Sequence, residues 1–196
     1  MTSTVHLGTS QTLPVPRAKR GVIVSRPRGP ARMVTRNLSF TAQIHGRAEI
    51  IFDLIADMPN YDRWLPNSSA FGGTIDVKPY PVRLGTTYLD AGPILKPGMV
   101  TEFDRPRAIS FRHTVQIRQN PLNTDIDSQI RYTLETKNGG TFVDRRLALA
   151  FDLRGISRLA LPLLLYGFRK ENNRTLNCLK KYVESPGIEI SASAPG

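Results

Sequence analysis

The feature that most constrains this fold is a run of six strand-like segments followed by one long helical segment. We expect the strands at residues 73–78, 86–90, 99–104, 108–118, 125–137 and 141–154. Short turn signals such as Pro97-Gly98 and Asn138-Gly139 separate them. Strands with such short connections pair mainly as an antiparallel meander, because a parallel pair needs a long crossover.

The segments on either side complete the predicted architecture. Residues 34–45 alternate and predict a first strand, residues 47–58 have helical spacing, and residues 60–66 predict a second short helix or turn. Residues 156–184 predict a long helix, the one large element able to cover the apolar face of the sheet. The predicted class is therefore α+β, with a curved antiparallel sheet of about seven strands around that helix. The gap between them is a natural ligand cavity.

Positive charge is concentrated before the predicted domain. The formal net charge is +11, but eight of the 27 basic residues precede the first acidic residue, Glu49, leaving nineteen basic and sixteen acidic residues. We therefore expect a disordered basic leader at residues 1–33, a domain at residues 34–185 and a flexible tail at residues 186–196. An arginine-rich, acid-free leader also resembles a mitochondrial transit peptide, and a dispensable extension before Met33 is the other interpretation.

Composition excludes several classes of function. The single cysteine, Cys178, allows no intrachain disulfide and favours a reducing compartment, so we expect a cytoplasmic protein, with mitochondria as the alternative. The sequence lacks a basic stripe with interleaved aromatic residues, so we expect no nucleic-acid binding. Membrane contact is expected to be weak. Zinc-ligand spacing, phosphate-binding glycine loops and a nucleophile elbow are missing, so we expect no metal and no cofactor. The sequence predicts no oligomeric state.

His113 is the leading candidate for chemistry. Strand alternation places it on the same face as Ile109, Phe111, Val115 and Ile117, which directs its imidazole toward the core or a cavity. A neutral imidazole there can act as a general acid or base. The alternative is a core histidine satisfied by a neighbouring hydroxyl or carbonyl.

Arg145 raises a similar question of orientation. It alternates with Val143 and Leu147, which would bury its guanidinium, unless a bulge after Gly140 reverses the register. Tyr132 shares a face with its apolar neighbours and completes the catalytic candidates. Asp90 shares a face with Tyr88 and is interpreted as a surface carboxylate. The remaining candidates are predicted ligand contacts: Trp64, Tyr88, Phe111, Val115, Leu147, Leu165 and Phe168.

Five motifs, taken in order, resemble one known superfamily. They are the helical segment 48–66 with its Trp64 and Pro66, the segment Leu84-Gly85-Thr86-Thr87-Tyr88, the strand–Pro–strand segment 100–111, the Gly139-Gly140-Thr141 hairpin turn, and residues 179–184 at the end of the long helix. Together they resemble the START/polyketide cyclase (SRPBCC) superfamily, whose fold is the helix grip. The resemblance implies a cavity for a hydrophobic small molecule. It also implies either cofactor-independent cyclisation, dehydration or isomerisation of a polyketide- or terpenoid-like compound, or a non-enzymatic lipid or quinone carrier.

Overall fold

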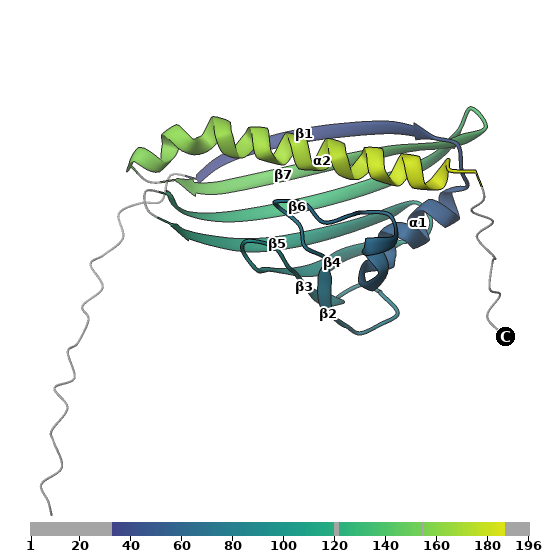
Figure 1. Ribbon diagram of the computed structural model, residues 1–196, viewed down its shortest axis with the longest axis horizontal. Helices are drawn as coiled ribbons and strands as arrows, with labels where there is room; N and C mark the ends of the chain where they lie inside the picture. Colours follow the sequence, from purple (N-terminus) through teal and green to yellow (C-terminus); the bar gives the residue numbers. More distant parts are fainter. Residues whose placement is uncertain (1–32, 120–121, 154, 187–196) are drawn as a thin grey trace, which may run out of the picture. The chain divides into compact units, whose positions relative to one another are not determined.

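The computed structural model describes residues 33–119, 122–153 and 155–186, so the predictions for residues 1–32 and 187–196 lie outside the described residues. The predicted class is confirmed: strands, two short helices after the first strand, and one long C-terminal helix (Figure 1). In chain order the elements are β1 (Met33–Ile44), α1 (Ala48–Ala56), η1 (Met58–Arg63), β2 (Thr74–Lys78), β3 (Thr87–Asp90), β4 (Lys96–Asp104), β5 (Ala108–Gln119), β6 (Leu122–Lys137), β7 (Gly140–Leu153), η2 (Gly155–Ala160) and α2 (Leu161–Val183).

The seven strands form one antiparallel sheet in the order β1-β7-β6-β5-β4-β3-β2. Strands β2 to β7 pair in sequence as a meander, as their short connections require. The first strand pairs with the last, β7, in an unbroken register along its whole length. Asn138 and Gly139 connect β6 to β7 with φ angles of 53° and 72°, the conformation that tight hairpins use.

One predicted turn is wrong. Pro97 and Gly98 lie inside β4, where they pair with Leu89 and Tyr88 of β3. Gly98 is required there because a Cβ at this position would lie 2.4 Å from Cζ of Tyr88. A glycine that lets a neighbouring ring approach closely looks in sequence like a turn glycine.

The long helix α2 lies across the inner face of the sheet, over β1 and β7 (Figure 1). Sequence periodicity predicted a single helix from residue 156, but 155–160 form the separate turn η2, and α2 begins at Leu161 with Pro162 in its first turn. The buried residues of α2 all belong to its C-terminal half, whereas Leu163 and Tyr166 are 72% and 64% exposed. The C-terminal half therefore holds the helix against the sheet.

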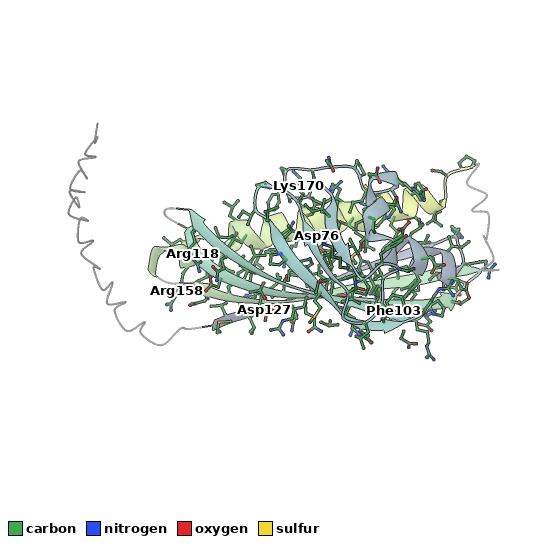
Figure 2. All side chains as sticks on the ribbon, turned by 90° about the horizontal axis from the view of Figure 1, so that it is seen from below. Asp76, Phe103, Arg118, Asp127, Arg158 and Lys170 are labelled. Atoms are coloured by element: carbon green, nitrogen blue, oxygen red, sulfur yellow. The ribbon has the colours of Figure 1, made fainter. Side chains whose placement is uncertain are left out.

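The outer face of the sheet is charged. Arg112 pairs with Asp127 at 2.6 Å, and Arg131 pairs with Glu102 at 2.7 Å. Hydrogen bonds from Arg131 and Ser110 lower the pKa of Glu102 to about 2. Figure 2 shows Asp127 on the side of the sheet away from α2 and Lys170 on the opposite side of the molecule. Alternation thus places charge outside and apolar residues inside. In the part of the chain that the structure describes, no helix combines the length and hydropathy needed to cross a bilayer.

Two glycines should respond oppositely to substitution by alanine. A Cβ at Gly140 would lie 2.5 Å from the carbonyl oxygen of Ile44, so Gly140→Ala should lower the free energy of unfolding by about 1–3 kcal/mol. A Cβ at Gly167 meets nothing within 4 Å, so Gly167→Ala should raise it by about 0.5–1 kcal/mol through helix propensity. Urea unfolding measures both. Equal stability of Gly140→Ala and the parent chain would contradict the close approach of β1 to the β6–β7 turn.

Candidate functional site

A cavity of about 410 Å³ lies between the inner face of the sheet, the η1 segment and the N-terminal half of α2. Its position follows from the packing of α2, because most of the helix residues that border the cavity belong to the N-terminal half, which has no buried residue. The wall is mainly apolar, with aromatic and aliphatic side chains from β5, β6 and β7 on one side. Polar side chains interrupt it at eleven positions: Tyr61, Tyr88, Asp90, Lys96, His113, Ser128, Tyr132, Arg145, Glu171, Asn172 and Thr175.

Most of the predicted ligand contacts line this cavity. Six of the seven do so: Trp64, Tyr88, Phe111, Val115, Leu147 and Phe168. Leu165 instead packs against the core, outside the lining. The apolar part of the wall from α2 includes Leu164 and Phe168, which are four residues apart and share one face of the helix.

His113 belongs to a buried hydrogen-bonded network. Its Nε2 lies 3.0 Å from the hydroxyl of Tyr88 and 3.1 Å from Oδ2 of Asp90. Thr74 donates to the other oxygen of Asp90 at 2.7 Å. The interpretation of Asp90 as a surface carboxylate is therefore wrong: its side chain is 15% exposed and lines the cavity.

Gly98 allows this network to cross a strand. Tyr88, Gly98 and His113 are register partners on β3, β4 and β5, so glycine lies between the two functional side chains. Because Gly98 has no side chain, the Tyr88 ring lies over β4, and its hydroxyl reaches His113 two strands away. The same residue that the sequence assigns to a turn thus positions the network.

The partners of His113 indicate its neutral tautomer. An ionised carboxylate only accepts hydrogen bonds, so Nε2 carries the proton in its bond to Asp90. In the neutral ring, the lone pair then stays on Nδ1.

Arg145 faces inward. The register between β6 and β7 is unbroken, with Tyr132 directly opposite Arg145, so the bulge that would expose it does not occur. Arg145 is 8% exposed, its Nη1 donates to the hydroxyl of Tyr132, and its Cζ lies 4.8 Å from the centroid of the Tyr132 ring. All three catalytic candidates, His113, Tyr132 and Arg145, therefore border the same cavity.

Helix α2 contributes polar residues that the sequence interpretation missed. Asn172 and Thr175 are 4% and 5% exposed and line the cavity, with Phe168 and Leu179 on the same helical stripe. Residues 168, 172, 175 and 179 have the spacing of a buried helical face. The polar residues Asn172 and Thr175 within that face are the sequence signal that could have identified them as part of the site. Nδ2 of Asn172 donates to the carbonyl oxygen of Phe168 at 2.7 Å, and its Oδ1 is buried with no partner among the described residues.

Three tyrosine hydroxyls give the cavity its electrostatic character. Burial raises the pKa of Tyr61 and of Tyr88 well above 10.0, and nearby negative charge adds to the shift. Burial also raises the pKa of Tyr132, although the positive charge of Arg145 opposes that shift. All three therefore remain protonated hydrogen-bonding groups at neutral pH. Tyr61 donates to the carbonyl oxygen of Ile55 at 2.5 Å.

The raised tyrosine pKa values predict a loss of stability in alkali. Phenols that hold their protons more tightly in the folded chain stabilise it fully below about pH 10. Above that pH the unfolded chain loses protons first, so the free energy of unfolding should fall as pH rises through 10 toward the folded-state values. Urea unfolding between pH 8 and 11 measures the slope. Tyr88→Phe should flatten it, and Tyr166→Phe, at a residue 64% exposed, should not. Identical slopes in both variants would contradict the burial of Tyr88.

Comparison with known proteins shows likeness in fold. No protein-family model matches the sequence, and no curated protein matches it. The structure is similar to protein Mll3558 from Rhizobium loti, with a TM-score of 0.57 and 15% identity over 77% of this chain and 99% of that one. Major latex-like protein 151 from Panax ginseng has a TM-score of 0.55 and 9% identity over 77% and 99% of the two chains. The di-domain ARO/CYC BexL has a TM-score of 0.57 and 13% identity over 77% and 50%.

Proposed function

Since this chain has the helix-grip fold of the START-like (SRPBCC) superfamily, we propose that its cavity binds a hydrophobic small molecule. The observation that carries the proposal is the mainly apolar cavity of about 410 Å³. That volume falls in the range of small-molecule sites, which combine apolar walls with a few placed polar groups. Shared fold by itself does not assign a ligand, whereas the size and the mainly apolar lining of this cavity do suit a hydrophobic small molecule.

The packing of α2 also supports this proposal. Gly167 lines the cavity at a point where the helix presents no side chain, and it is followed by Phe168, which packs edge-on against Phe151 at 6.2 Å between ring centroids. Glycine costs about 1 kcal/mol in a helix interior relative to alanine. Glycine at this point of the cavity wall leaves room for a bound molecule, or for a molecule to enter and leave the cavity.

A neutral fluorescent probe tests the binding proposal. N-phenyl-1-naphthylamine should bind the protein at about one site per chain, with increased fluorescence. Gly167→Trp adds bulk at the cavity wall, at a position where a Cβ meets nothing within 4 Å, and should weaken binding at least tenfold. The matched control Asn173→Trp adds the same side chain at an exposed position of α2 outside the lining and should leave binding unchanged. The proposal would be wrong if the native chain did not bind the probe, or if Gly167→Trp and Asn173→Trp lost affinity equally.

The hydrogen-bonded network favours a second candidate function, cofactor-independent cyclisation, dehydration or isomerisation. Such reactions pass through an enolate when a base removes a proton next to a carbonyl. In this arrangement Nδ1 of His113 takes the proton, the C–H electron pair becomes the enolate, and Arg145 donates a hydrogen bond to its oxygen. Asp90 holds the ring and stabilises the resulting imidazolium. A lipid or quinone carrier would need none of these steps.

Deuterium exchange separates an enzyme from a carrier. If the cavity supports enolisation, the protein should accelerate exchange at C2 of α-tetralone in D₂O, followed by NMR. His113→Gln should reduce that acceleration at least tenfold, in line with general-base catalysis. His45→Gln replaces an exposed histidine and serves as the control. Binding of α-tetralone without accelerated exchange would leave the carrier as the function.

A further inference from the structure

Arg145 places a permanent positive charge in the cavity wall, and no acidic residue in the described part of the chain pairs with it. Its side chain is buried, and within the described residues its one side-chain hydrogen bond is donated to Tyr132, a neutral phenol. Its Nε is buried and has no hydrogen-bond partner among the described residues. A guanidinium cannot shed its proton at physiological pH, and a buried charge is costly unless it is paired. Contact with the Tyr132 ring offsets part of that cost but leaves the Nε–H group unused.

The carboxylates around the cavity are engaged elsewhere. Asp90 accepts from Thr74 and contacts His113. Glu171 accepts from Ser68 and pairs with Arg174. Burial raises the pKa of Glu171, but the hydrogen bonds of Arg174 and Ser68 and the charges of Arg174 and Lys96 together lower it below its usual value. Asp144, next to Arg145 in β7, pairs with Arg146 at 2.8 Å. Within the residues that the structure describes, the charge of Arg145 is therefore left available to a ligand.

We propose that Arg145 binds an acidic oxygen group, such as a carboxylate, phenolate or enolate, on an otherwise apolar ligand. This inference deepens the proposed function and depends on it. The guanidinium presents its donors as a planar fork that suits paired oxygens, and burial strengthens such charge-assisted hydrogen bonds. The ligand would supply both the missing counter-charge and the acceptor that Nε lacks.

Asn172 supports the same class of ligand from the opposite wall. Its Nδ2 faces a carbonyl oxygen, which fixes the amide orientation and leaves Oδ1 as a buried acceptor without a partner. An acceptor there is matched by a hydroxyl or N–H donor. Nε of Arg145 is matched by a hydrogen-bond acceptor on the ligand, and Oδ1 of Asn172 is matched by a donor. A ligand with both groups is an oxygenated amphiphile and not a plain hydrocarbon.

Two probes with one ring skeleton test the inference. N-phenyl-1-naphthylamine is neutral, whereas 8-anilino-1-naphthalenesulfonate carries one sulfonate on the same rings and the same secondary amine. The native chain should bind the sulfonate more tightly. Arg145→Met should weaken sulfonate binding at least tenfold, about 1.4 kcal/mol, and leave the neutral probe within twofold. Arg145→Lys keeps the charge and should retain part of the preference.

Arg146 provides the matched control. It is the next residue of β7, its side chain is 70% exposed, and it points away from the cavity. Arg146→Met removes the same charge and should change neither affinity. Thermal unfolding of each variant reports whether it is folded, and saturating sulfonate probe should raise the Tm of the native chain more than that of Arg145→Met.

The outcomes separate the two proposals. Binding of neither probe would overturn the proposed function itself. Tight binding of the neutral probe with no preference for the sulfonate in the native chain would overturn the role of Arg145 while leaving the cavity proposal intact. Equal loss of both probes in Arg145→Met would make Arg145 a packing residue. Should Arg145→Met not fold, the preference of the native chain and of Arg145→Lys still decides the question.

Discussion

The contact between α2 and the inner face of the sheet is the interaction on which the rest of this structure depends. Leu176 and Leu179 are almost fully buried, and they hold the C-terminal half of the helix against the sheet. Gly46 allows that approach, because a Cβ there would lie 2.5 Å from Cγ1 of Val183. The N-terminal half has no buried residue, so the sheet beneath it keeps an uncovered apolar surface. The cavity is the space that this uneven packing leaves.

Strand alternation then determines which side chains enter that space. Because successive residues of a strand face opposite sides, His113 and Arg145 are carried inward together with their apolar neighbours. The network around His113 is satisfied within the protein, through Asp90 and Tyr88. Nε of Arg145 and the amide oxygen of Asn172 have no hydrogen-bond partner in the described part of the chain. A fold that keeps unpaired polar atoms in an apolar wall gives up stability, and such exceptions are commonly found where a protein binds its ligand.

Some parts of the site could be predicted from the sequence because they depend only on the two-residue alternation of side chains along a strand. The inward face of β5, with Phe111, His113 and Val115, follows from alternation over a long strand. Leu165 was placed in the cavity and lies outside it, because apolar spacing defines a helical stripe but not which edge of it borders the gap. Asp90 was assigned to the surface, since its partner His113 lies 23 positions along the chain and two strands away in the sheet. Gly98 was predicted to lie in a turn for the same reason, because its role depends on the ring of Tyr88 on the neighbouring strand β3.

By itself the sequence determined the order of strands and helices, the meander, the long C-terminal helix and the inward face of β5, because these depend on local periodicity, turn chemistry and short connections. Only the tertiary structure decided that Arg145 lies in an unbroken register, that Tyr88 crosses Gly98 to reach His113, and that half of α2 leaves a cavity open. These features depend on pairings between residues distant in the chain, and on how closely two surfaces pack. Neither quantity is encoded in the spacing of apolar residues along one segment.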